Sequence, residues 1–235
     1  MPFKFDKARV QYVWKLFDEK KSFLSTLKNE IKGEVEDGAR ITGPVHIGRN
    51  TVVHSGAIIR GPVWIGEGAS IRWHAVVRDG SILGNDVVVG ANCEVKDSIL
   101  MTGAKMQGTY CGNSIMGEQA RVSSGTVFEN RKFNRKEVII GPIPEIGLDH
   151  KISTGLNFLG CILGDQSRLG GITACFPGTL IGQHTWVYGH QHLRGFIPSN
   201  TLVKKFVDPR LEETNQSVRK DKIALDSGFD DYEWR

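Results

Sequence analysis

The fold is decided by residues 35–71, VEDGARITGPVHIGRNTVVHSGAIIRGPVWIGEGASI, in which an aliphatic residue recurs at every sixth position. A period of six is neither the 3.6 of a helix nor the 2 of an ordinary strand, so it indicates a repeat architecture. The series continues to residue 95. Its members are Val35, Ile41, Ile47, Val53, Ile59, Ile65, Ile71, Val77, Leu83, Val89 and Val95.

Each hexapeptide supplies one short strand and one bend, and three hexapeptides close a triangular coil. The aliphatic residue points into the coil and stacks on its counterparts about 4.8 Å above and below. A small or β-branched residue stands four positions after each aliphatic residue, from Ala39 to Ile99, and the 28 glycines suit a chain that bends so often. We therefore expect an all-β chain whose residues 34–196 form a single-stranded parallel β-helix.

The six-residue register is interrupted twice. It breaks over residues 101–115, resumes at Met116 and Val122, and breaks again over residues 127–162 before it returns at Leu163. The sequence thus predicts eighteen hexapeptides, or about six coils, with a loop insertion at each break. Inserted residues leave the wall of a solenoid, so binding and catalytic groups are expected there.

The two ends of the chain differ from the repeat. Residues 1–33 carry apolar residues at helical spacing, which predicts one amphipathic helix or two short ones that end at Gly33 and cap the first coil. Residues 197–235 are highly charged and predict a C-terminal tail that is helical or partly disordered.

Composition excludes several classes of protein. The formal net charge is only +4 and the chain has no dense run of Lys and Arg, so nucleic-acid binding is not expected. The chain has no apolar stretch of membrane-spanning length and no hydrophobic signal region at its start, which predicts no membrane association and a cytoplasmic location. Its four cysteines form no Cys-x-x-Cys pair, so we expect reduced thiols.

Several segments resemble one family in their order and spacing. They are IGRNTVVHSGAIIRGPVWIGEG, VVRDGSILG, CEVKDSILMTGAK, TYCGNSIMGE and LGCILGDQSRLGG, and YVWKLFDEKKSFLSTL resembles the linker helix that precedes them. Together they are similar to the β-helix half of bifunctional sugar-1-phosphate nucleotidyltransferases, in their archaeal and thymidylyltransferase-like branch. The phosphate loop of the nucleotidyltransferase half does not occur in this chain. The resemblance implies a left-handed coil, a homotrimer and active sites between neighbouring prisms.

The resemblance also assigns roles to individual residues. It implies acetyl transfer from acetyl-CoA, a co-substrate, to an amino-sugar phosphate or nucleotide sugar. Arg78, Lys96 and Tyr110 match positions that bind the acceptor substrate, and Arg121 stands where some members carry a substrate-binding Asn. Ser124 and Asn130 match positions near the cofactor, and a further family lysine there falls at Arg135 or Lys136, of which we take Lys136. No metal is expected at this site.

The largest departure from the family lies at the catalytic base. Members carry a histidine three residues before the tyrosine that corresponds to Tyr110, and this chain has Gln107 there. A glutamine amide cannot accept a proton at neutral pH, so it cannot replace an imidazole. His150, in the second expected insertion, and water are the two substitute bases that we consider.

Three hypotheses for the function follow. The first is an acetyltransferase or other acyltransferase that acts on a sugar phosphate or nucleotide sugar. The second is a catalytically degenerate binding or assembly subunit that partners a separate nucleotidyltransferase. The third is a metalloenzyme like the γ-class carbonic anhydrases, suggested by IRWHAVVRDG and ranked last because residues 75–149 contain no histidine.

Overall fold

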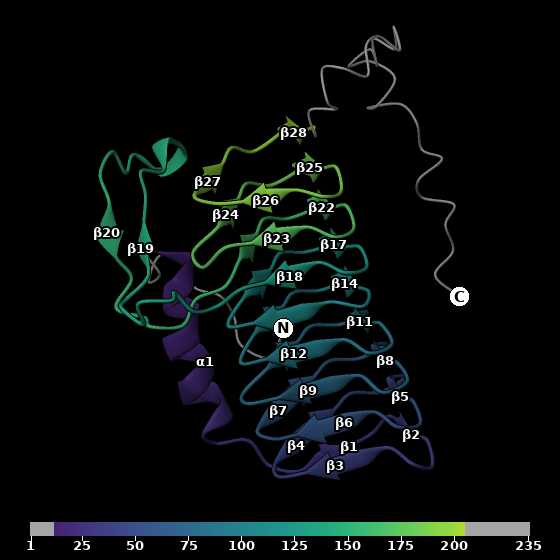
Figure 1. Ribbon diagram of the computed structural model, residues 1–235. Coiled ribbons are helices and arrows are strands. Elements are labelled where there is room, and N and C mark those ends of the chain that lie inside the picture. The colour runs from purple at the N-terminus through teal and green to yellow at the C-terminus, as the bar shows by residue number, and fades with distance from the viewer. Residues whose placement is uncertain (1–11, 205–235) are drawn as a thin grey trace, which may run out of the picture. The chain divides into compact units, whose positions relative to one another are not determined.

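The computed structural model describes residues 12–204, which form a β-solenoid of three parallel sheets with a helix along one side (Figure 1). In every coil the chain passes from sheet A to sheet B to sheet C and then returns to sheet A.

Sheets A and B contain nine strands each and sheet C contains eight. Sheet A consists of β1 (Glu30–Ile31), β4 (Val45–Ile47), β7 (Val63–Ile65), β10 (Ile82–Leu83), β13 (Ile99–Leu100), β16 (Ile115–Met116), β21 (Ile162–Leu163), β24 (Leu180–Ile181) and β27 (Phe196–Ile197). Sheet B consists of β2 (Glu34–Val35), β5 (Val52–Val53), β8 (Ser70–Ile71), β11 (Val88–Val89), β14 (Lys105–Met106), β17 (Arg121–Val122), β22 (Arg168–Leu169), β25 (Trp186–Val187) and β28 (Leu202–Val203). Sheet C consists of β3 (Arg40–Thr42), β6 (Ile58–Arg60), β9 (Val76–Arg78), β12 (Glu94–Lys96), β15 (Tyr110–Gly112), β18 (Val127–Phe128), β23 (Ala174–Cys175) and β26 (His192–Leu193).

The six-residue period produces the core as expected. The aliphatic residues from Ile47 to Val95 are fully buried inside the coils, and the small residues between them, such as Ala57 and Ala75, are buried with them. Only the first two members, Val35 and Ile41, are less covered, because they lie at the open end of the stack. The parallel β-helix is confirmed.

The expected loop insertion over residues 101–115 is wrong. Strands β13, β14, β15 and β16 run through this segment and pair in register with the coils on either side. Their inward residues are Leu100, Met106, Cys111 and Met116, so three of the steps from Val95 are five residues long instead of six. A one-residue shortening at a corner leaves the strands in place but ends a strict six-residue count. The solenoid therefore has more coils than the six that the period predicts.

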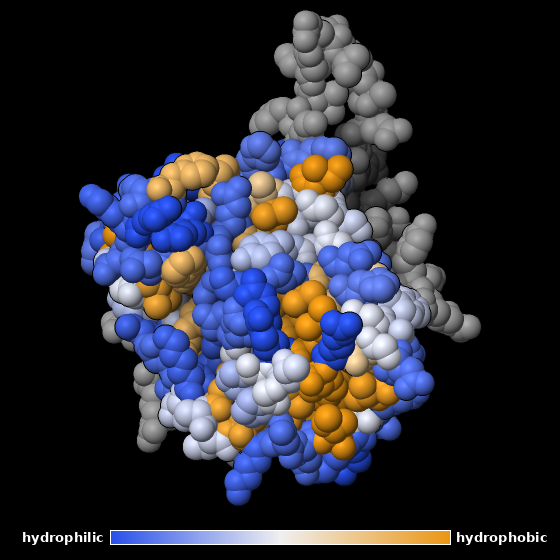
Figure 2. All heavy atoms as spheres, turned by 60° about the horizontal axis from the view of Figure 1, so that its bottom comes forward, coloured by the Kyte–Doolittle hydropathy of each residue, from blue (hydrophilic) through white to orange (hydrophobic). Residues whose placement is uncertain are grey.

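The N-terminal helix does not cap the first coil, and it ends at Leu24 instead of Gly33 because strand β1 already occupies Glu30–Ile31. After the 3₁₀ turn η1 (Val13–Lys15), helix α1 (Leu16–Leu24) lies along the outer face of sheet A (Figure 1). Trp14 of η1 and Phe17 of α1 join a second apolar core with the outward-facing Ile99 and Ile115. Within the described residues the end of the stack stays open, and Figure 2 shows apolar side chains gathered on the face that this end presents.

The second expected insertion is present but shorter than residues 127–162, because Val127–Phe128 and Ile162 belong to strands β18 and β21, and it covers the same face as α1. It leaves sheet C after β18 and returns to sheet A at β21, and it contains the antiparallel pair β19 (Ile139–Ile140) and β20 (Ile152–Ser153) with the turn η2 (Pro144–Ile146) between them. Val138, Ile140 and Leu159 belong to the second core. The outer face of sheet A is thereby covered by segments from two distant parts of the sequence.

The repeat continues beyond residue 196, where we expected it to end, because β27 and β28 add further strands up to Val203. The rest of the expected tail, from residue 205, lies outside the described residues, as do residues 1–11. Over residues 12–204, no helix combines the length and the apolar character needed to cross a membrane.

Candidate functional site

The site is built on the outer face of sheet C, where the strand register places side chains of successive coils in columns. One column contains Arg60, Arg78, Lys96 and Gly112, because β6, β9, β12 and β15 pair residue by residue. The second column, two residues earlier in each strand, contains Glu94 and Tyr110. Residues between the columns point into the core, since side chains alternate along a strand.

Arg78 is held by two carboxylates. Its Nε atom donates to Oε1 of Glu94 over 2.8 Å, its Nη2 lies 2.6 Å from the same oxygen, and its Nη1 forms an ion pair with Asp79. Although partial burial opposes the charge of Arg78, the bond to Glu94 and the charge of Asp79 raise its pKa above the ordinary value. Arg78 is thus a fixed cation whose own charge is balanced within the wall.

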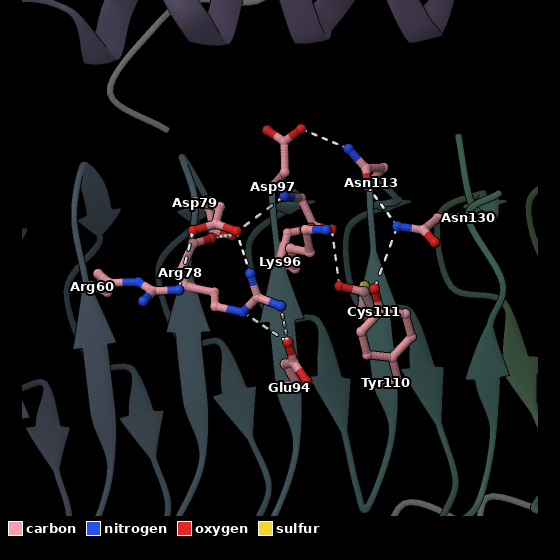
Figure 3. A network of polar contacts seen from close by, with 12 residues as sticks. Arg60, Arg78, Asp79, Glu94, Lys96, Asp97, Tyr110, Cys111, Asn113 and Asn130 are labelled. Atoms are coloured by element: carbon pink, nitrogen blue, oxygen red, sulfur yellow. Dashed lines mark hydrogen bonds and ion pairs between the residues drawn. The ribbon is translucent and has the colours of Figure 1, made fainter. Parts of the chain in front are cut away.

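Tyr110 lies at the start of a chain of hydrogen bonds that runs along the corner between sheets C and A (Figure 3). Nδ2 of Asn130 donates to the Tyr110 hydroxyl over 3.3 Å and to Oδ1 of Asn113 over 2.7 Å. Nδ2 of Asn113 in turn donates to Oδ2 of Asp97 over 2.6 Å. Burial and the carboxylate of Glu94 raise the pKa of Tyr110, so its hydroxyl stays protonated at neutral pH.

This series of hydrogen bonds ends at a buried lysine of helix α1. Lys20 is fully buried, and its Nζ atom forms an ion pair with Oδ1 of Asp97. Burial lowers the pKa of Lys20, and the neighbouring carboxylate of Asp97 opposes that shift. The same ammonium group lies 5.0 Å from the centre of the Phe17 ring. Helix α1 is therefore joined to the polar corner of the solenoid as well as to its apolar face.

A pocket of about 470 Å³ opens between helix α1 and this corner. Lys21 and Leu24 line it from the helix, Lys96 and Asn113 line it from the solenoid, and Phe158 lines it from the second insertion. Three separate parts of the chain thus contribute to its walls.

The pocket contains unneutralised positive charge. Both carboxylates in its wall are already bound, Asp79 to Arg78 and Asp97 to Lys20. Lys96 has no carboxylate partner within residues 12–204, and its Nζ atom lies 5.6 Å from the centre of the half-exposed Phe158 ring. The guanidinium carbon of Arg131 lies 4.9 Å from the centre of the same ring. An anionic ligand with an apolar face suits these walls.

Cys111, between Tyr110 and Gly112, is not a nucleophile of this site. Its side chain points into the core, and complete burial raises the pKa of its thiol to about 12. The reactive form of cysteine is the thiolate, so this residue is inert at neutral pH.

Of the residues that the sequence nominated, the structure brings Arg78, Lys96, Tyr110 and Asn130 together on sheet C and its corner with sheet A. Gln107 and Ser124 lie at the other edge of sheet C, where the chain arrives from sheet B after β14 and β17. Arg121 lies on sheet B, in register with Lys105 and Arg168.

Of the nominated residues, only Lys96 lines the pocket, and Lys136 and His150 lie farther along the second insertion than Asn130. Lys136 is exposed, and its backbone N–H donates to Oδ1 of Asn134 over 3.1 Å. His150 is exposed, and its Nδ1 atom lies 2.7 Å from a carboxylate oxygen of Asp149. Within one chain neither residue contacts Tyr110 or Lys96, so the suggested substitute base does not reach this pocket.

Sequence reasoning missed Lys20, Asp97, Asn113 and Phe158. A signal for two of them was present, because Asp97 and Asn113 follow β12 and β15 at the same corner and both have a positive φ, 48° and 45°. Asp and Asn are the side chains that tolerate this conformation best. Lys20 gave no such signal, since a lysine between charged residues of a helix normally faces water.

The described residues contain no group of three or more His, Cys, Asp or Glu side chains that could hold a metal ion. Three histidines near the end of the repeat lie on different parts of one coil: His184 precedes β25, His190 follows it, and His192 lies in β26.

Comparisons with known proteins agree with this architecture. Residues 59–143, which contain most of the site, match the family model described as the GMPPB C-terminal domain. The chain is 32% identical to the bifunctional protein GlmU of Methanocaldococcus jannaschii over 82% of its own length and 46% of the relative. It is 33% identical to the bifunctional sugar-1-phosphate nucleotidylyltransferase/acetyltransferase of Sulfurisphaera tokodaii over 74% of its length and 43% of the relative.

A solved structure, the UDP-N-acetylglucosamine acyltransferase from Campylobacter jejuni, aligns with 70% of this chain and 69% of its own. The sequence identity is 12% and the TM-score is 0.40, so the assignment rests on the sequence relatives.

The repeat, its three sheets and these relatives define a hexapeptide-repeat β-solenoid protein. Within that class, the chain matches the acetyltransferase part of the archaeal bifunctional sugar-1-phosphate nucleotidyltransferase/acetyltransferases. It spans about half the length of the curated relatives that it matches.

Proposed function

We propose that this protein is an acyltransferase that moves an acetyl group from acetyl-CoA to the amine of an amino-sugar phosphate or nucleotide sugar. The observation that carries the proposal is the position of Lys96. It is in register with Arg78 and one coil from Tyr110, and it lines a pocket whose carboxylates are already paired. A phosphate is the group that such a cation binds best, and the Phe158 ring offers an apolar surface to the sugar.

The reaction that fits these groups is attack of the neutral amine on the thioester carbonyl. The C–N bond forms, the C–S bond breaks, the amine loses a proton, and coenzyme A leaves as its thiol after it receives a proton. The protein must orient the amine, bind the phosphate and donate a hydrogen bond to an oxygen. Lys96 and Tyr110 supply the last two functions.

No imidazole lies at the base position, so we propose that water takes the proton. In that case the enzyme works on the fraction of acceptor amine that is already neutral. Its rate should then rise with pH through the ordinary pKa of the amine.

We further propose that the chain acts as a homotrimer. Helix α1 and the second insertion cover sheet A, which leaves the outer faces of sheets B and C for contacts between prisms. Such a contact would bring Arg121 and Lys105 on sheet B of one prism toward sheet C of the next. Burial, followed by the nearby positive charge of Arg121, lowers the pKa of Lys105, which indicates a concentration of positive charge suited to an anionic ligand.

The direct test is to incubate the protein with acetyl-CoA and glucosamine 1-phosphate and to measure release of the free thiol. Galactosamine 1-phosphate and a UDP-linked amino sugar serve as further acceptors. Acceptor-dependent release that is lost in Lys96→Met supports the proposal. A rate equal to the background with every acceptor would overturn it. Analytical ultracentrifugation of the full chain measures its molar mass in solution. A monomeric mass would exclude the trimer.

A second candidate is a non-catalytic subunit that binds a sugar phosphate and partners a separate nucleotidyltransferase. It is supported by Gln107, which cannot act as a base. This candidate predicts binding of the sugar phosphate in a calorimetric titration without any acetyl transfer. A measurable turnover number would exclude it.

A further inference from the structure

Helix α1 contributes one polar group to the corner of the solenoid, and that group lies at the end of the hydrogen-bond chain that reaches Tyr110. The order is Lys20, Asp97, Asn113, Asn130 and Tyr110, with each neighbour joined by a hydrogen bond or ion pair. Each asparagine amide has a donor end and an acceptor end, so the chain has a direction. The carboxylate of Asp97, at the buried end of the hydrogen-bond chain, fixes that direction.

An ionised carboxylate only accepts hydrogen bonds. Since Asp97 faces Asn113, the amide of Asn113 must turn its Nδ2 toward the carboxylate. Its Oδ1 then faces Asn130, whose Nδ2 must donate. The second hydrogen on that nitrogen is left for the Tyr110 oxygen, 3.3 Å away.

The Tyr110 oxygen thus receives a hydrogen bond from inside the protein. Its own hydrogen does not point back at the donor and is directed elsewhere. The hydroxyl is therefore set as a donor toward whatever oxygen lies in front of it. A chain of the opposite direction would make the hydroxyl donate to the Oδ1 atom of Asn130 and present only lone pairs.

Lys20 keeps the hydrogen-bond chain in the direction in which Asn130 donates to the Tyr110 oxygen. A cation in contact with a carboxylate favours its charged, acceptor-only form. Lys20 contacts Oδ1 of Asp97 while Asn113 donates to Oδ2, so both oxygens of this carboxylate act as acceptors and neither donates to Asn113.

We propose that Lys20 is a positioning residue of the site: through Asp97, Asn113 and Asn130 it sets the Tyr110 hydroxyl as a hydrogen-bond donor to an oxygen of the bound acceptor. The direction of the chain stands on the contacts alone. That the receiving oxygen belongs to the acceptor substrate rests on the proposed function.

The first test needs no activity. Neutron diffraction from crystals of the full chain grown in D₂O locates the deuterium atoms. The expected result is two deuterium atoms on Asn113 Nδ2, one of them toward Asp97, and a Tyr110 deuterium that points away from Asn130. A Tyr110 deuterium directed at Asn130 would overturn the proposal.

The second test is a mutant cycle on acetyl transfer from acetyl-CoA to glucosamine 1-phosphate. The double variant Lys20→Met with Asp97→Asn leaves no buried unpaired charge, so it is expected to fold, but it removes the acceptor-only group. Its kcat/KM should fall about 10-fold, the value of one hydrogen bond of typical strength. In the Tyr110→Phe background the same double change should cost less than about 2-fold, because the hydroxyl that it orients is absent.

A merely structural role predicts a different result, since loss of stability or of helix docking would lower activity equally in both backgrounds. An equal effect in the two backgrounds would therefore overturn the proposal. Lys15→Met is the matched control, because Lys15 adjoins the same helix and is exposed. If the unaltered protein transfers no acetyl group, the proposed function fails while the neutron map still decides the direction of the chain.

Discussion

The hydroxyl of Tyr110 lies across the space that a side chain at Gly112 would occupy. A β-carbon at Gly112 would come within 2.5 Å of Tyr110 Oη and within 2.7 Å of Asn130 Nδ2. The column that carries Arg60, Arg78 and Lys96 therefore ends in a glycine so that the tyrosine can lie along its own strand.

Gly112→Ala should displace Tyr110 and separate it from Asn130, because the added carbon and the hydroxyl cannot both fit. We expect kcat/KM for acetyl transfer to fall at least to the level of Tyr110→Phe, and a crystal structure to show the ring moved. Gly155→Ala is the control: it adds strain at a φ of 72°, but no atom lies within 4 Å of the new carbon. An unchanged Tyr110 in Gly112→Ala would contradict this reading.

Gln107→His restores a proton acceptor at the position where the family has one. General-base catalysis typically contributes about 10²- to 10⁴-fold, so the rate of thiol release at pH 7 should rise toward that range. The pH profile should also gain a rise near the ordinary pKa of histidine, about 6.5. Gln107→Asn, which accepts no proton, should bring neither change. An equal response to both substitutions would show that this position does not take part in proton transfer.

Lys96→Met should weaken binding of the sugar phosphate. A hydrogen bond to a charged group contributes about 1.5–3 kcal/mol, so KM for glucosamine 1-phosphate should rise roughly 10- to 100-fold. The KM for acetyl-CoA should change less. Lys151→Met, at an exposed position outside the pocket wall, is the control. An unchanged KM in Lys96→Met would remove Lys96 from the phosphate site.

The buried Lys20 predicts a dependence of stability on pH. Burial lowers its pKa in the folded protein, while the unfolded chain keeps the ordinary value near 10.5. Between these two values the unfolded chain binds more protons, so the free energy of unfolding rises with pH in that window. We expect the unaltered protein to gain stability there relative to the Lys20→Met, Asp97→Asn double variant. Denaturant titrations measure the free energy of unfolding of both proteins. If their difference stayed constant from neutral pH to pH 10.5, this prediction would be contradicted.

Phe17→Ala tests whether helix α1 is anchored on sheet A. Phe17 is buried in the second apolar core with Ile99 and Ile115, so its truncation should cost about 3–5 kcal/mol of stability if the helix stays docked. Urea unfolding measures the loss. Asp18→Ala, on the exposed side of the same turn, should change stability by less than about 0.5 kcal/mol. A similar small effect for both would mean that the helix is not packed as described.

The repeat could be predicted from the sequence because its signal is local: one aliphatic residue in every six is buried in the same way. The count failed at Val95, where the inward residues become Leu100, Met106 and Cys111 and the corners lose a residue. Parallel pairing tolerates this change because the strands, and not the corners, carry the register. No periodicity in the sequence records such a compensation.

The site was predictable only as far as side chains on adjacent strands share a column. Arg78, Lys96 and Tyr110 meet because the coils are in register. Lys20 and Phe158 could not be predicted, because their positions depend on how helix α1 and the insertion fold back against sheet A. Those contacts join residues far apart in the sequence, and neither segment carries the repeat.

The covered face of sheet A has a consequence for any attempt to re-engineer this protein. The coils from β1 to β18 contain Arg78, Lys96 and Tyr110 but neither Lys20 nor Phe158. A transplanted or shortened stack of coils would therefore keep the surface chemistry of sheet C and lose the walls that enclose it. The solenoid sets the spacing between the functional groups. Helix α1 and the second insertion supply the side chains that form a pocket beside them.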